Sequence, residues 1–216
     1  MECLLGVVGK EHVILGADRT GGRSVLLMKS DVEKMYQLSP TCAMVVAGEA
    51  GDTTHFGEFL KKQFKLHSMK YEYGLSIAEI ADYIRYQLAK AIRSRHPYMV
   101  NVLVGGVNEE GSSELYYLDY LGTKAKVPYG AHGYGSYFTL STMDRLHSSS
   151  QNQDKSIEQL HQCIREINKR LVLNLSSFNI YIITKEGIRS NVVITKDVLL
   201  DQDPGLPPER LTLMEK

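Results

Sequence analysis

The sequence predicts an α+β protein, specifically a four-layer αββα sandwich in which two stacked antiparallel sheets are flanked by pairs of helices. Along the 216 residues, the predicted order is strands, two helices, strands, two helices, strands. Helices that come in adjacent pairs argue against a doubly wound parallel sheet, in which single helices alternate with single strands. Nearly continuous apolar runs, such as residues 41–47, are typical of strands that are covered on both faces.

The first part of the chain predicts strands only. Apolar residues at 1–8 and 13–18 predict a β-hairpin around a tight turn at 9–12. Because chain ends commonly fray unless a sheet holds them, an apolar first strand that leads to the charged Asp18 is a candidate site. Further apolar strands, also expected to be covered, are predicted at 25–28, 34–38 and 41–47.

Two helices follow. Apolar side chains at helical spacing between Gly51 and Tyr71 predict the first one. Ser76 and Glu79 form a capping box, in which each side chain accepts a hydrogen bond from the backbone of the other. The second helix is expected to extend to His96, since the residue before a proline avoids the helical region.

The second half of the chain has the same order of elements and then a tail. Asp154 is expected to cap the fourth helix. Prolines at 204, 207 and 208 argue against regular structure there, so we expect one domain at 1–196 and an extended C-terminal tail at 197–216. The remaining predictions are strands at 100–105, 114–119 and 123–127, a helix at 136–146 after the glycine-rich loop 130–135, and a hairpin formed by 178–184 and 188–193.

Charge and cysteine content narrow the possible partners. Lys plus Arg and Asp plus Glu both number 25, and a net charge of zero argues against nucleic acid or an anionic membrane as a partner. Without a leader or an apolar run near 18 residues, the protein is expected to be soluble and intracellular. The three cysteines Cys3, Cys42 and Cys163 lack a C-x-x-C pair, which predicts buried thiols and no metal site or cofactor.

Several residues are candidates for chemistry. Asp18 and Lys34 could be a working acid–base pair, but we favour a buried ion pair, whose disruption costs about 3–5 kcal/mol. The loop 130–135 could cradle a phosphate, yet its glycines do not follow G-x-G-x-x-G, which favours a tight strand-to-helix connection. His132 is expected to be packed or hydrogen-bonded. The side chains of Tyr116, Tyr117 and Tyr120 are expected to serve the core and subunit contacts in preference to stacking on bases.

An ordered set of residues across nearly the whole chain resembles the beta-type subunits of the 20S proteasome. The set comprises Gly6, the runs 13–19, 48–52 and 116–119, Lys34, and the stretch from 133 to 145. Within this family, residues 1–2, 97–101, 117–121 and 131–135 are most similar to the non-catalytic subunits at the fourth position of the eukaryotic beta ring, the beta type-2 group. The resemblance implies the αββα fold of the N-terminal nucleophile hydrolases.

The resemblance also indicates which catalytic groups this chain retains. Catalytic members use an N-terminal threonine as nucleophile and its free amine as base. Their aspartate and lysine match Asp18 and Lys34, and their nucleophile, sixteen residues before the aspartate, matches Glu2. Tyr134 stands where they have a serine, and residues 170–174, where a later aspartate and serine are expected, supply neither. The resemblance therefore implies no catalytic residue, and a vestigial frame of Glu2, Asp18 and Lys34.

The implied function is that of a non-catalytic structural subunit of the 20S core. Its partners would be other beta subunits in both rings and the alpha-ring subunits, in the ubiquitin-dependent degradation of proteins in cytoplasm and nucleus. One alternative is an active peptidase subunit that exposes Cys3 after processing, although the strand period turns Cys3 away from Lys34 if Glu2 faces it. A free-standing binding module is a further alternative.

Overall fold

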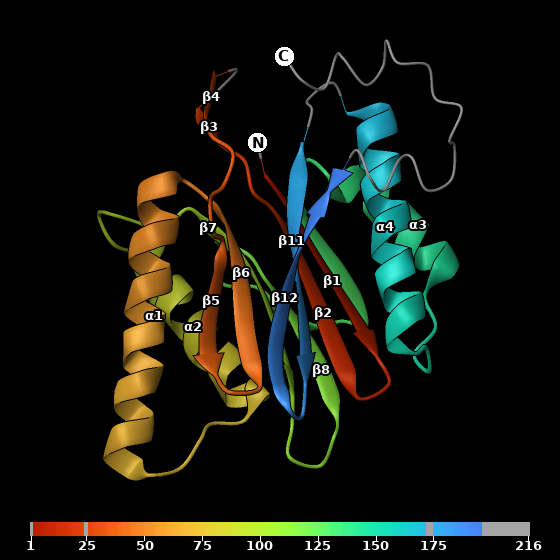
Figure 1. The fold of residues 1–216 in the computed structure, drawn as a ribbon. Coiled ribbons are helices and arrows are strands. Elements are labelled where there is room, and N and C mark those ends of the chain that lie inside the picture. The colour runs from red at the N-terminus through yellow and green to blue at the C-terminus, as the bar shows by residue number, and fades with distance from the viewer. Residues whose placement is uncertain (1, 24–25, 172–174, 196–216) are drawn as a thin grey trace.

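Two five-stranded antiparallel sheets, a separate two-stranded sheet and four helices make up the computed structural model, which describes residues 2–23, 26–171 and 175–195 (Figure 1). The first sheet has the strand order β10-β1-β2-β11-β12 and the second has the order β5-β6-β7-β8-β9. The strands are β1 (Cys3–Gly9), β2 (His12–Asp18), β3 (Gly21–Arg23), β4 (Leu26–Lys29), β5 (Met35–Ser39), β6 (Cys42–Gly48), β7 (Val100–Val107), β8 (Ser113–Leu118), β9 (Lys124–Lys126), β10 (Tyr129–Gly133), β11 (Ser177–Thr184) and β12 (Gly187–Ile194). The helices are α1 (Ala50–Tyr71), α2 (Ile77–Ala91), α3 (Ser136–Leu146) and α4 (Gln153–Arg170).

Strand β1 shows how the two sheets share a core. Because successive side chains of a strand point to opposite faces, Cys3 and Leu5 pack in a cluster with residues of α3 and α4, while Leu4 packs in a cluster with residues of the second sheet. Gly6 lets the sheets approach each other, since a Cβ there would lie 3.0 Å from the side chain of Leu115. The whole strand is buried apart from one half-buried residue.

Three clusters of buried apolar residues account for the packing. One joins α1 and α2 to the second sheet, one joins α3 and α4 to the first sheet, and one lies between residues of the two sheets. In Figure 1 the pair α1 and α2 lies on one side of the strands and the pair α3 and α4 on the other. The α+β class and the pairing of the helices are therefore as predicted.

Two helix boundaries differ from the predictions. Helix α2 ends at Ala91, with Ile92 as its C-cap, and does not reach His96, because its last buried side chain is Leu88 and nothing anchors a further turn. The N-cap of α4 is Asn152, whose side chain accepts a hydrogen bond from the backbone N–H of Lys155. The prediction of Asp154 as the cap was wrong. Asp154 lies in the first turn, where its negative charge interacts favourably with the helix dipole and stabilises the helix.

The prediction of a covered strand at 25–28 was also wrong in one respect. Strand β4 forms, but Leu26, Leu27 and Met28 are 70%, 66% and 77% exposed. The reason is that β4 pairs only with β3, in a two-stranded sheet separate from the other two. An apolar run predicts a strand, but it does not say whether the same chain covers it.

Two further predictions concern the whole chain. The tail predicted at 197–216 lies outside the described residues, so the proposed domain boundary stays a prediction. Among the helices that the structure describes, none combines the length and the apolar character that crossing a membrane requires.

Candidate functional site

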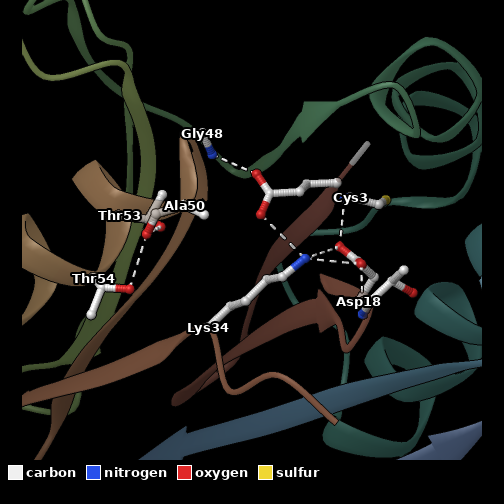
Figure 2. Close-up of polar contacts among 9 residues, drawn as sticks. Cys3, Asp18, Lys34, Gly48, Ala50, Thr53 and Thr54 are labelled. Carbon is white, nitrogen blue, oxygen red and sulfur yellow. Dashed lines mark hydrogen bonds and ion pairs between the residues drawn. The ribbon is translucent and has the colours of Figure 1, made fainter. Parts of the chain in front are cut away.

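The end of β2 and the start of β5 bring Asp18 and Lys34 together. Asp18 is the last residue of β2 and has no exposed surface, and Lys34 comes directly before β5 and is 5% exposed. The Nζ atom of Lys34 lies 2.9 Å from both carboxylate oxygens of Asp18 (Figure 2). The two residues therefore form the buried ion pair that the sequence predicted.

Backbone amides complete the environment of Asp18. The N–H of Cys3 donates to Oδ1 at 2.8 Å, and the N–H of Thr20 donates to Oδ2 at 3.0 Å. Each carboxylate oxygen thus accepts from Lys34 and from one amide. A buried carboxylate with this set of donors is satisfied, and its hydrogen bond to Cys3 holds the start of β1 in place.

Glu2 is the third member of the cluster. Its Oε1 atom lies 3.3 Å from Nζ of Lys34, and its Oε2 atom accepts a hydrogen bond of 2.5 Å from the backbone N–H of Gly48. The side chain of Glu2 is 23% exposed, so the cluster opens to the surface at this point. The ammonium group of Lys34 and the amide N–H of Gly48 therefore each bind one oxygen of the Glu2 carboxylate, which lies between the two donors.

Glycine is required on both sides of Glu2. At Gly48, with φ of +148°, a Cβ would lie 1.9 Å from the carbonyl oxygen of Met99. At Gly133, with φ of +79°, a Cβ would lie 1.9 Å from the carbonyl oxygen of Glu2 itself. The prediction of a loop at 130–135 was wrong for most of its length, because Tyr129–Gly133 form strand β10, which pairs with β1. Only Tyr134 and Gly135 lie between β10 and α3, so the tight strand-to-helix connection is confined to these two residues.

His132 lies in strand β10, and Tyr134 directly follows this strand. His132 is 4% exposed, its ring stacks on Tyr117 with 4.0 Å between centroids, and its Nε2 lies 3.2 Å from the carbonyl oxygen of Val102. Burial lowers the pKa of His132 to about 4. Tyr134, at the position where the resemblance implied a serine in catalytic members, is 59% exposed. His132 is packed and hydrogen-bonded, as predicted.

Cys3 faces the other side of β1. Its side chain is 1% exposed and lies in the cluster that contains residues of α3 and α4. Burial raises the pKa of the Cys3 thiol well above its usual value, the charges of Asp18 and Cys163 raise it further, and Lys34 opposes them. A thiol that stays protonated is a poor nucleophile. Cys42 and Cys163 are buried free thiols too, as the sequence predicted.

Sequence reasoning missed two residues that bind Glu33, the chain neighbour of Lys34. The hydroxyl of Tyr181 donates to Oε1 of Glu33, and the side-chain amide of Asn179 donates to Oε2 at 3.2 Å. Burial, followed by the hydrogen bond to Glu33, raises the pKa of Tyr181. The signal was available, because Asn179 and Tyr181 put polar atoms into an otherwise apolar strand and such atoms need partners.

The remaining predicted positions add nothing to the cluster. Arg170 ends α4 with an exposed side chain that donates to Glu166 at 3.0 Å, and residues 172–174 lie outside the described residues. Within the described ranges, no three His, Cys, Asp or Glu side chains come together in a way that could hold a metal ion. The absence of a metal or cofactor remains a prediction.

An α+β fold of two antiparallel sheets and paired helices, with a buried aspartate–lysine pair next to the start of the first strand, agrees with the N-terminal nucleophile hydrolase fold that the resemblance implies. Comparison with family models agrees, since the model described as "Proteasome subunit" matches residues 2–183. The chain belongs to the proteasome subunit family.

Comparison with individual proteins is more specific. The chain is 38% identical over 190 residues to proteasome subunit beta type-4 of Saccharomyces cerevisiae, covering 88% of this chain and 96% of the relative. It is 40% identical to proteasome subunit beta type-2 of Oryza sativa, covering 88% and 89%. It is 41% identical to proteasome subunit beta type-2-B of Arabidopsis thaliana, covering 88% and 94%. The predicted resemblance to beta-type subunits, and to the beta type-2 group among them, is confirmed.

Proposed function

We propose that this chain is a non-catalytic structural subunit of the beta ring of the 20S proteasome. The observation that carries the proposal is the position of Glu2, whose carboxylate contacts Lys34 and the backbone N–H of Gly48. The chain would support assembly and form part of the wall of the chamber in which neighbouring subunits cut ubiquitin-tagged proteins.

Glu2 is incompatible with the chemistry of the family in two ways. A nucleophile that attacks a peptide carbonyl needs a hydroxyl or thiol whose proton a base can take, and a carboxylate offers neither. The same carboxylate lies between the Lys34 ammonium and the Gly48 amide and binds both, one through each oxygen, so a carbonyl oxygen of a substrate would have to displace it to reach these donors. The first argument is available from the sequence, and the second depends on the geometry.

The alternative of a processed peptidase that begins at Cys3 finds no support in this geometry. The thiol lies in the core on the side of α3 and α4, while Lys34 contacts Glu2 on the opposite side of the strand. Bringing Sγ to the position of the Glu2 carboxylate would require β1 to shift by one residue. Such a shift would turn every apolar side chain of β1 to the wrong face.

The proposed assembly follows from the family and from the arrangement of the helices. We infer the four-layer αββα order, supported by one apolar cluster between the sheets and one beneath each helix pair. With helices on both outer faces, the chain can contact the alpha ring and the opposite beta ring through helices, and its neighbours in the beta ring through its sides. The exposed Leu26, Leu27 and Met28 fit such a contact. We place the particle in cytoplasm and nucleus.

The proposal is tested by purifying the chain from its own cells under native conditions. It should elute in a very large particle together with other proteasome subunits, and Glu2→Ala should leave the peptidase activity of that particle unchanged. A stable monomer would contradict the assembly role. The control is the particle that contains the unchanged chain. Peptidase activity that this control retains and the Cys3→Ala particle loses would contradict the non-catalytic role.

A further inference from the structure

A concave surface lies along the second half of α1, far from the site described above. We refer to it as the α1 groove; it encloses about 770 Å³ between α1, the β5–β6 turn and the connection from α1 to α2. Helix α1 begins two residues after Gly48 and has 22 residues, so the groove lies roughly 12–28 Å along the helix from the site. In Figure 1 this end of α1 lies opposite the end that meets the site.

The floor of the α1 groove is apolar and preformed. It includes Leu38 of β5, Phe64 of α1 and Ile80 of α2, which are 8%, 6% and 1% exposed and belong to one core cluster. Since these side chains are held by the core, a ligand would not have to order them. A preformed apolar floor of this volume is typical of a binding site.

The lip of the groove exposes large apolar side chains. Leu66, Met69 and Tyr73 are 58%, 69% and 57% exposed. The ring of Tyr73 packs against His67, with 5.2 Å between centroids, and His67 packs against Tyr71 at 4.7 Å. These contacts hold the lip in place. Tyrosine and methionine on a fixed apolar lip are enriched where proteins bind other proteins.

The rim of the groove is positively charged. It has three lysines, Lys61, Lys62 and Lys65, against the single carboxylate of Glu58, which pairs with Lys62 at 3.7 Å. Among the described residues, Lys61 and Lys65 have no ion-pair partner, while the β5–β6 turn contributes only uncharged residues to the lining. Because the whole chain has zero net charge, this excess is local to the groove.

We infer that the α1 groove binds an acidic segment with an apolar face from a neighbouring subunit of the same particle. Apolar side chains of the segment would fill the floor between Leu38, Phe64 and Ile80. Its carboxylates would face Lys61 and Lys65, whose charges then gain the partners that the described part of this chain does not supply. The inference rests on the proposed role as a subunit, and it adds where a contact forms and the chemistry of the partner.

The test uses a photoreactive benzophenone amino acid in place of Leu66, in the full chain within its native particle. After irradiation, mass spectrometry should identify a crosslinked peptide of another subunit that combines apolar residues with at least two Asp or Glu. A neutral or basic crosslinked peptide would overturn the inference, and so would no crosslink from a chain that has entered the particle.

Charge variants provide a second measurement. Lys61→Glu with Lys65→Glu should lower the crosslink yield about tenfold, since two attractive pairs become repulsive. Lys61→Arg with Lys65→Arg should preserve it, and equal yields for both variants would overturn the inference. Elution of the chain is measured before irradiation. A chain that elutes as a monomer contradicts the subunit role itself, which distinguishes that failure from a failure of the groove.

Discussion

Two buried polar clusters lie at opposite ends of the β1–β2 hairpin, and they are built differently. At the open end, Asp18 and Lys34 form a charged pair at 2.9 Å, to which Glu2 adds a second carboxylate. At the turn end, Nε2 of His12 lies 2.8 Å from Oγ of the Ser156 hydroxyl. Both clusters contain fully buried groups, but only the charged one reaches the surface.

The cluster at the turn end joins the hairpin to α4. The side-chain amide of Gln151 donates to Ser156 Oγ at 2.9 Å and to Gln159 Oε1 at 2.8 Å, while Nδ1 of His12 lies 2.8 Å from the carbonyl oxygen of Lys10. Its members satisfy one another and are 0–5% exposed. The difference indicates that hydroxyl and amide groups join the turn end to α4, whereas at the open end charged groups meet the surface.

The largest expected effect comes from breaking the charged cluster. Lys34→Met leaves the carboxylate of Asp18 buried without its counter-charge, and we expect the free energy of unfolding in urea at pH 7 to fall by about 3–5 kcal/mol. The matched control is Lys29→Met, because Lys29 pairs with Asp31 at 3.4 Å but both side chains are at least 60% exposed. The control should change stability by less than about 0.5 kcal/mol.

A double variant sharpens this result. Asp18→Asn with Lys34→Met removes both charges and keeps an acceptor for the backbone N–H of Cys3. It should be less destabilising than Lys34→Met alone, since no fully buried charge is left unpaired and the remaining carboxylate, Glu2, is partly exposed. A double variant as unstable as the single one would show that lost packing, and not the uncompensated charge, causes the effect.

The next effect concerns pH, through a buried group that lies in neither cluster. His132 has a folded-state pKa of about 4, below the usual value of 6.5, so between these values the unfolded state binds more protons. The contribution of His132 to the free energy of unfolding is complete above pH 6.5. It is lost as the pH falls, and at pH 4 the loss is about 3 kcal/mol. Unfolding of the chain and of His132→Gln, followed from pH 7 to pH 4, should give diverging curves; parallel curves would rule this contribution out.

Breaking the cluster at the turn end should lower the free energy of unfolding less than breaking the charged pair. Ser156→Ala removes the partner of His12 Nε2 and one acceptor of the Gln151 amide, which are both buried. We expect a loss of about 1–3 kcal/mol, the range for buried groups left without a hydrogen bond. Ser150→Ala, an exposed change one residue from Gln151, is the control and should be nearly neutral. Equal losses for both variants would mean that the network contributes nothing specific.

The smallest effect is expected for Glu2→Gln. Its side chain is partly exposed and only one of its contacts is with a charge, so stability should fall by less than about 1 kcal/mol. The exposed Glu11→Gln serves as the reference for removing one negative charge. A loss for Glu2→Gln as large as that for Lys34→Met would mean that Glu2, and not Asp18, is the main partner of the lysine.

Much of the fold could be predicted because local rules agree with it. Apolar runs predicted most of the strands, the pairing of the helices predicted the α+β class, and the Ser76–Glu79 capping box predicted the start of α2; strand β10 was missed. The errors lie where local rules leave a choice. Asn152 and Asp154 are both good caps, and only tertiary contacts around Gln151 select the first. The exposure of β4 depends on which chain covers it, which no local pattern contains.

The site was predicted only in part for a similar reason. Spacing along the chain matched Glu2, Asp18 and Lys34 to family positions, and the structure brings these three side chains together. The contact between Glu2 and the backbone N–H of Gly48 spans 46 residues and involves no side chain of Gly48. A backbone donor leaves no mark in a sequence, so the blocked position of the site could be found only from the geometry.

The most direct test of the central claim is the reactivity of the native particle toward an electrophile that forms adducts with N-terminal nucleophiles. After treatment, the subunits are separated and their intact masses are measured. We predict that the mass of this chain does not change while catalytic neighbours gain the mass of the adduct, because Glu2 supplies no attacking group. An adduct on this chain, located at its first residues, would contradict the account.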